Sequence, residues 1–263
     1  MAVVRRLLAA ASWREVFLRR CRVCGDPIPP GAAGAALATA GWPPRGVCPA
    51  CVAALAPRQG GFCPRCGAME ADPAADPCLC AACLIEGRPF AVVAFHAAYG
   101  GLLRDLIVAY KFGRHPEHGA VLRELLLLAY VRARADRGGP DADTAVPAEP
   151  DVVVPVPLHP ARLAWRGFNQ SLELARPLAR THGWRIDARA LARIRDTRPQ
   201  STLSGRLRRE NIQGAFAADA SRVRGRRVLL TDDVMTTGAT VETAAKALLS
   251  AGARRVDVLV LAR

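Results

Sequence analysis

The chain has 263 residues, of which 51% are hydrophobic and 23% charged, a balance that excludes wholesale disorder and supports a packed core. Its 37 basic and 23 acidic residues give a net charge of +14, which favours anionic partners such as nucleotides, phosphates, nucleic acid or acidic lipid. No apolar run reaches the roughly 18 residues that span a bilayer, so the sequence predicts no transmembrane segment and a cytoplasmic protein.

Residues 1–20 start like a signal peptide, with two arginines before a short apolar stretch. That stretch is interrupted by Trp13-Arg14-Glu15, and a second apolar patch, Val16-Phe17-Leu18, runs directly into Arg19-Arg20. The pattern therefore predicts an amphipathic helix over residues 1–20 rather than an export signal. Its apolar face would pack on the rest of the chain, or bind a membrane surface or a partner.

The nine cysteines all lie between residues 21 and 83, and eight of them form four Cys-x-x-Cys pairs. Two such pairs supply four thiolates, which complete the tetrahedral shell of one structural zinc ion. Residues 21–88 are therefore predicted to be a double zinc-ribbon-like module that binds two zinc ions. The predicted metal ligands are Cys21, Cys24, Cys48, Cys51, Cys63, Cys66, Cys80 and Cys83.

The pairing of these cysteines stays open at the level of sequence. The simplest arrangement joins the first two pairs and the last two pairs, but a crossed arrangement is also possible, and Cys78 is a looser substitute for Cys80. Disulfides are the competing interpretation, yet cysteines three apart close a loop too short to add much stability. Four tandem copies are also untypical of a redox Cys-x-x-Cys. Residues 29–47, rich in Gly, Ala and Pro, are predicted to be a flexible insertion.

Residues 89–263 contain no cysteine, and strand-like apolar runs alternate there with helical patterns. This alternation predicts an α/β domain in which a parallel sheet carries helices on both faces, with ligands at the carboxyl ends of the strands. Residues 138–150 form a linker rich in Gly, Pro and Asp. The predicted strands are 90–97, 151–156, 228–230 and 256–261, and the predicted helices are 102–110, 117–136, 167–182, 204–211 and 240–251.

One segment combines two kinds of binding group. The apolar run 228–230 leads through Thr231 to two adjacent carboxylates, and a loop rich in Thr and Gly then precedes a helix. Loop N–H groups, hydroxyls and the helix N-terminus suit a phosphate, whereas carboxylates only accept hydrogen bonds and so suit sugar hydroxyls. The segment therefore predicts a ribose clamp beside a 5′-phosphate site, formed by Asp232, Asp233, Val234, Met235, Thr236, Thr237, Gly238, Ala239 and Thr240.

Two other interpretations of this segment were weighed. Paired acids after a strand also occur in Mg2+-dependent phosphotransfer domains, but the Thr/Gly loop would then be unexplained. A plain surface turn can carry Asp232-Asp233, but the residues that follow lack the usual solvated charges.

The same segment resembles the binding motif for 5-phosphoribosyl 1-pyrophosphate (PRPP) of type I phosphoribosyltransferases. The chain from Cys21 to Arg263 resembles the ComF family, competence-associated proteins in which a cysteine-rich zinc module precedes such a domain. Cys78 and the 29–47 insertion are the departures from the family pattern. The other motifs that carry the resemblance are Tyr110-Lys111-Phe112-Gly113, Val154-Pro155-Val156-Pro157-Leu158-His159, Arg166-Gly167-Phe168-Asn169-Gln170, Arg195-Asp196-Thr197-Arg198-Pro199-Gln200-Ser201 and Leu207-Arg208-Arg209-Glu210-Asn211-Ile212-Gln213-Gly214-Ala215-Phe216.

The resemblance implies a type I phosphoribosyltransferase fold for residues 89–263, PRPP or ribose 5-phosphate as ligand, and Mg2+ bound with PRPP. Residues about 195–211 are implied to be a mobile loop over the site. The groups expected to hold pyrophosphate are Val156, Pro157, Arg166, Arg198 and Lys111. Residues 160–227 carry sixteen arginines and five acidic residues, a net of +11, which agrees with an anionic ligand or with a basic solvated face.

Two functions follow from the resemblance. The first is a PRPP-binding, transferase-like protein linked to DNA uptake and natural transformation, with an unidentified acceptor. The second is a non-catalytic competence protein that keeps the PRPP pocket and binds single-stranded DNA or a helicase partner. Aromatic residues make up only 5% of the chain, so the sequence does not indicate an extended platform for stacking bases.

Overall fold

A computed structural model describes residues 19–28, 42–112, 115, 117–135, 147–196 and 212–263. The predicted helix at 204–211 lies outside these residues. So do all but the last two residues of the predicted 1–20 helix and most of the 29–47 insertion.

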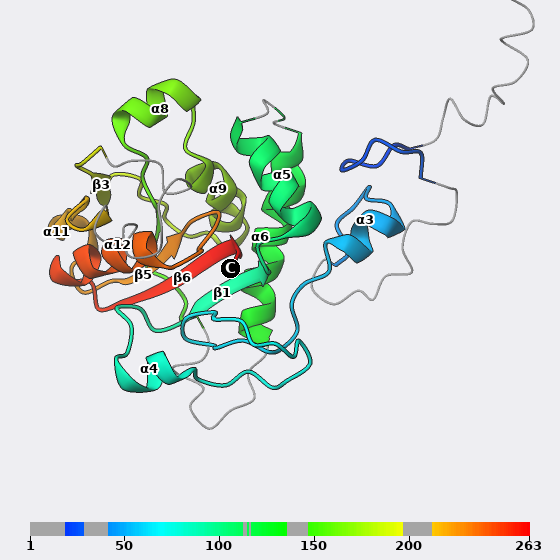
Figure 1. Cartoon of the computed structure of the whole chain (residues 1–263). Coiled ribbons are helices and arrows are strands. Elements are labelled where there is room, and N and C mark those ends of the chain that lie inside the picture. Colours follow the sequence, from blue (N-terminus) through cyan, green and yellow to red (C-terminus); the bar gives the residue numbers. More distant parts are fainter. Residues whose placement is uncertain (1–18, 29–41, 113–114, 116, 136–146, 197–211) are drawn as a thin grey trace, which may run out of the picture.

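The centre of the molecule is a sheet of four parallel strands in the order β1-β6-β5-β2 (Figure 1). The strands are β1 (Val93–Ala97), β2 (Val152–Pro155), β5 (Arg227–Thr231) and β6 (Arg255–Ala262). Most of their side chains are buried on both faces, which explains why each strand is a nearly continuous apolar run in the sequence. The predicted parallel sheet is confirmed.

Helices cover both faces of this sheet, as predicted. One face packs against α5 (Gly101–Phe112), α6 (His118–Ala135) and α9 (Gln170–His182), and the other against α12 (Ala239–Ser250). Because side chains alternate along a strand, Leu229 points to the first face and Leu230 to the second. Within the described residues, no helix combines the length and the apolar character that crossing a membrane requires.

Several short elements were not predicted. α8 (Pro160–Arg166) lies between His159, which caps its start, and Gly167, which ends it in a left-handed conformation with φ 84°. Because Gly167 ends α8, α9 begins three residues later than predicted, at Gln170. The other short elements are the antiparallel pair β3 (Leu191–Arg193) and β4 (Phe216–Ala218), and α11 (Ala220–Val223), which follows β4 and precedes β5 (Figure 1).

The cysteine-rich segment contains two short helices, α3 (Pro49–Ala54) and α4 (Ala81–Ile85), and packs on the sheet domain through both. Near α3, Arg22 forms an ion pair of 2.8 Å with Glu124 of α6. The buried His96 of β1 lies 2.7 Å from the Leu55 carbonyl oxygen, and burial lowers the pKa of His96 to about 4, so the neutral ring donates this bond.

Candidate functional site

The predicted ribose-phosphate segment lies at the carboxyl end of β5. Thr231 ends the strand, and Asp232 and Asp233 follow with only 8% and 4% of their surface exposed. The next residue, Val234, forms a bridge with Ala262 of β6, so the start of the loop is fixed to the sheet. Thr236 and Thr237 are exposed beyond it.

The loop leads directly into the N-terminus of α12. Gly238 takes a left-handed conformation, with φ 83°, and the first intrahelical bond runs over 2.8 Å from the Glu242 N–H to its carbonyl oxygen. The Ala239 N–H, which precedes this bond, donates to Thr237 Oγ1 at 3.5 Å. A small hollow at this point is lined by residues 234–241. Its N–H groups and threonine hydroxyls are suited to a phosphate.

The two carboxylates are engaged within the protein. Asp232 Oδ1 accepts hydrogen bonds from Ser171 Oγ at 2.8 Å and from the Asp233 N–H at 2.9 Å. Asp233 Oδ1 accepts from the Val234 N–H at 2.9 Å, and its other oxygen forms an ion pair with Lys111 Nζ. Burial, and then repulsion by Asp233, raise the pKa of Asp232 to about 7.

Three cations approach this acidic pair from different elements. Lys111 comes from the end of α5, Arg166 from the end of α8 and Arg193 from β3. Burial lowers the pKa of both arginines, while attraction to Asp233 opposes this shift for Arg166 and attraction to Asp232 opposes it for Arg193. The site therefore offers positive charge on the same side as the carboxylates.

Ser171 and Arg193 were not predicted as site residues. Each is far from Asp232 in the sequence, but Ser171 directly follows the motif 166–170 and Arg193 lies two residues before the motif 195–201, which are the local signals for them. Lys111 was expected at a pyrophosphate group, but the structure places its ammonium at Asp233. Arg166 donates to Gln170 Oε1 at 2.7 Å and lies 4.9 Å above the Phe112 ring. Arg198 lies outside the described residues.

The strand end expected to hold pyrophosphate has few backbone donors. The Val156 N–H donates to the Thr231 carbonyl oxygen at 2.9 Å, and its own carbonyl accepts from Asn169 Nδ2 at 3.1 Å. The neighbouring prolines, Pro155 and Pro157, have no N–H. The N–H of Val156, a residue expected to hold pyrophosphate, is therefore already bonded, and Val156 itself is buried just past the end of β2. His159 caps α8 and lies 3.6 Å from Asp196.

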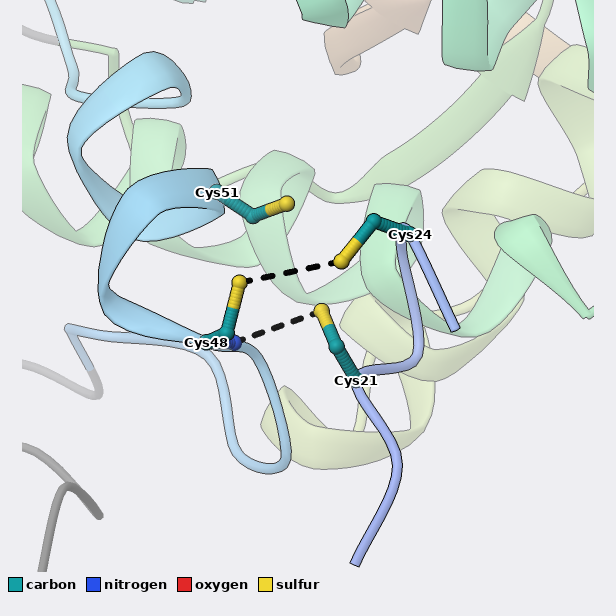
Figure 2. Close-up of side chains that lie close together, drawn as sticks. All are labelled: Cys21, Cys24, Cys48 and Cys51. Atoms are coloured by element: carbon teal, nitrogen blue, oxygen red, sulfur yellow. Dashed lines mark hydrogen bonds between the residues drawn. The ribbon is translucent and has the colours of Figure 1, made fainter. Parts of the chain in front are cut away.

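The first cysteine group consists of Cys21, Cys24, Cys48 and Cys51, whose sulfur atoms point toward one centre (Figure 2). All four lie within 4.8 Å of one another, and the Cys24 and Cys48 sulfurs are 3.7 Å apart. A tetrahedron with Zn–S bonds of about 2.3 Å has edges of about 3.8 Å, so the spacing fits this ion. Burial favours the neutral Cys21 thiol, but backbone N–H groups outweigh burial and lower its pKa to about 6.

The second cysteine group consists of Cys63, Cys66, Cys80 and Cys83, and the Cys66 and Cys80 sulfurs are 3.6 Å apart. Both groups follow the uncrossed arrangement, and all nine cysteines are free of disulfides. Cys78 lies outside both groups, where its thiol donates to Glu70 Oε1 at 3.1 Å. Burial raises the pKa of Cys66 to about 12, so full ionisation of such a group needs a bound cation. Either group can hold a metal ion.

The fold and the site define a class: an α/β protein with a phosphoribosyltransferase domain and two four-cysteine groups. The family model described as "Phosphoribosyl transferase domain" matches residues 169–263. DNA utilization protein YhgH of Salmonella typhi is 38% identical over 228 residues, which cover 86% of this chain and 93% of that protein. Competence protein F of Haemophilus influenzae is 36% identical over 116 residues, covering 43% of this chain and 51% of that protein. The chain belongs to the family of these proteins, the ComF family.

Two solved structures have a local likeness. The allosteric regulatory enzyme of purine biosynthesis aligns with a TM-score of 0.33 and 24% identity, over 53% of this chain and 25% of the enzyme. Glutamine PRPP amidotransferase from B. subtilis aligns with a TM-score of 0.32 and 23% identity, over 52% of this chain and 25% of that chain.

Proposed function

We propose that this protein binds PRPP and acts as a phosphoribosyltransferase-like protein in the use of DNA taken up by the cell, with an acceptor still to be identified. The observation that carries the proposal is the pairing of two carboxylates with an open Thr/Gly loop at the start of a 12-residue helix. The names of its relatives, a DNA utilization protein and a competence protein, support the link to DNA.

In this proposal each group has a separate task. Asp232 and Asp233 accept hydrogen bonds from the ribose hydroxyls, and residues 236–240 hold the 5′-phosphate through N–H and hydroxyl groups. For the ribose to bind, its hydroxyls must replace the hydrogen bond from Ser171 to Asp232 and the ion pair between Lys111 and Asp233. Lys111, released from Asp233, would then lie beside the ligand together with Arg166 and Arg193.

The transfer step breaks the bond between ribose C1 and pyrophosphate, which leaves with the bonding electrons, while a nucleophile bonds to C1. Arg166, Arg193 and Lys111 stabilise the negative charge that develops on the leaving group. Mg2+ bound with PRPP would supply further neutralisation of that charge. No described side chain is assigned as a general base.

Zinc is proposed as the resident metal of both cysteine groups. Four thiolates per ion leave no position for a substrate or water, so these ions are structural. Their role is to hold short segments with few helices and strands in a fixed shape.

Calorimetric titration with PRPP and Mg2+ tests the proposal. The wild type should bind saturably, and the double change Asp232→Asn with Asp233→Asn should weaken binding at least about tenfold, because the ribose loses charged acceptors. Asp105→Asn, at an exposed carboxylate of α5, is the matched control and should not change affinity. A wild-type protein that binds neither PRPP nor ribose 5-phosphate would refute the proposed function.

Single-stranded DNA is a second candidate ligand, favoured by one surface cluster. Phe112 and Trp165 are 55% and 70% exposed, with ring centroids 6.2 Å apart, and Arg166 lies over the Phe112 ring. Exposed rings beside cations are suited to stacked bases and phosphates.

Gel shifts with single-stranded DNA across a salt series test this second function. Trp165→Ala should weaken the complex about fivefold or more, since stacking on one ring contributes about 1–3 kcal/mol per base. Leu163→Ala, an exposed apolar residue of the same helix, is the control. An equal shift for Trp165→Ala and wild type would remove this cluster from DNA binding.

A further inference from the structure

Arg263 connects the second cysteine group to the phosphate loop. Its Nε donates to the Cys66 carbonyl oxygen at 2.8 Å, and its Nη1 donates to the Met235 carbonyl oxygen at 3.2 Å and to that of Thr236. Gly67 makes room for this side chain, because a Cβ there would lie 3.0 Å from Arg263 Cγ. One guanidinium thus joins a segment that carries cysteine ligands to the start of the loop.

Arg88 makes a second connection at the other end of the loop. Its Nη1 forms an ion pair of 2.7 Å with Glu242 Oε1 in the first turn of α12, and the nearby side chain of Cys83 raises the pKa of Arg88. The arginine and the glutamate are 22% and 20% exposed at their side chains, so water screens this pair only in part. The cysteine-rich segment therefore contacts both ends of the loop, through Arg263 at its start and through Arg88 at the first turn of α12.

Buried apolar contacts also join the second cysteine group to the phosphate loop. Cys63, Cys66 and Cys83 are buried in the same cluster as Met235 and Ala239. Three cysteines of the first group, Cys21, Cys48 and Cys51, are buried in the other cluster, with residues of α5 and α6. The second cysteine group therefore packs beside the phosphate loop, and the first packs beside α5 and α6.

The contacts of Arg263 determine which way the loop peptides face. In a trans peptide the C=O and the following N–H point in opposite directions. Because Arg263 binds the carbonyl oxygens of Met235 and Thr236, the N–H groups of Thr236 and Thr237 point away from it. Residues 234–241 line the hollow, so this orientation leaves those N–H groups available to a phosphate there.

We propose that the second cysteine group, when it holds its metal, fixes the phosphate loop through Arg263, which makes Arg263 a positioning residue for the 5′-phosphate. This inference rests on the proposed PRPP site. Loss of metal from the second group should impair phosphate binding, whereas loss from the first group should not.

Substitution of Arg263 tests the connection directly. Arg263→Met keeps the length of the side chain but removes its donors, and should weaken ribose 5-phosphate binding about tenfold in calorimetry. It should also speed amide hydrogen exchange at residues 236–241 while two zinc ions stay bound. Arg254→Met, at an exposed arginine, is the control and should change neither measurement. Unchanged affinity and exchange in Arg263→Met would overturn the inference.

A matched pair of cysteine variants tests the role of the metal. Cys48 and Cys80 are counterparts: each is the N-cap of a short helix and has a sulfur neighbour, at 3.7 Å and 3.6 Å. Cys48→Ser and Cys80→Ser should each lose about one zinc ion, but only Cys80→Ser should weaken ribose 5-phosphate binding. Equal affinities in the two variants would overturn the inference. If the wild type itself fails to bind, the proposed function fails first, so the two failures are distinguishable.

Discussion

Asp232 is a carboxylate that the fold keeps almost out of water, with a pKa of about 7 caused first by burial and then by Asp233. An ionised carboxylate in this position costs stability unless a ligand or a cation compensates its charge. Lys111 supplies part of that compensation through Asp233. The charges of Asp232, Asp233 and Lys111 therefore depend on one another.

The raised pKa predicts how stability depends on pH. Below about pH 4 Asp232 is protonated in both the folded and the unfolded chain; as pH rises toward 7 the unfolded chain ionises first, so the stabilising effect of the raised pKa is lost. Between pH 5.5 and 7.5 the free energy of unfolding of the wild type should fall relative to Asp232→Asn by roughly 2 kcal/mol. Denaturant unfolding of the zinc-loaded proteins measures this difference, and parallel pH profiles would contradict it.

Part of the site could be predicted from local sequence and part could not. Asp232 and Asp233 follow an apolar strand directly, so their place at the sheet edge follows from β5 alone. Ser171 and Arg193 reach the same place from other elements; each adjoins a recognisable motif, but its contact with the acidic pair depends on how those elements pack. Lys111 belongs to a recognisable motif, but its partner is fixed by where α5 ends relative to β5.

The helices and strands that were predicted are those whose apolar residues form a continuous run or recur at helical spacing. Buried parallel strands are apolar runs, and α5 and α12 carry apolar residues at helical spacing. β3 and β4 have three residues each and are defined by pairing with each other, so periodicity could not find them. α8 did carry signals, Pro160 at its first turn and Gly167 just past its end.

Gly238 is a position where the loop depends on backbone freedom. Gly238→Ala should lower the free energy of unfolding by about 1 kcal/mol, the cost of a left-handed conformation for a residue with a Cβ. It should also weaken ribose 5-phosphate binding, because relief of that strain rotates the N–H groups at the start of α12.

Gly183→Ala provides the matched control for this change. Gly183 ends α9 in the same conformation, with φ 70°, and a Cβ there meets nothing within 4 Å. Thermal unfolding should show a loss for both variants, larger for Gly238→Ala because a Cβ there would also lie 3.0 Å from Met235 Cε. Calorimetry should show weaker binding for Gly238→Ala alone. Weaker binding in both variants would mean that general destabilisation, and not the loop, causes the effect.

The metal content of the purified protein follows from the two cysteine groups. The purified protein should contain about two zinc ions per chain, and Cys78→Ser should keep both, because Cys78 lies outside the two groups. Removal of zinc by a chelator should lower the unfolding temperature, since metal binding contributes to folding in such modules. Elemental analysis that finds one ion, or a Cys78→Ser protein that loses one, would contradict the assignment.

The two cysteine groups lie in the two separate apolar clusters on opposite sides of the sheet. The cysteine-rich segment, residues 21–88, therefore covers apolar surface on both faces of the sheet. A fragment that starts near residue 89 would expose that surface and should aggregate when expressed. Attempts to transfer the phosphoribosyltransferase domain to another protein, or to crystallise it after truncation, should therefore keep the chain from Arg19 onward.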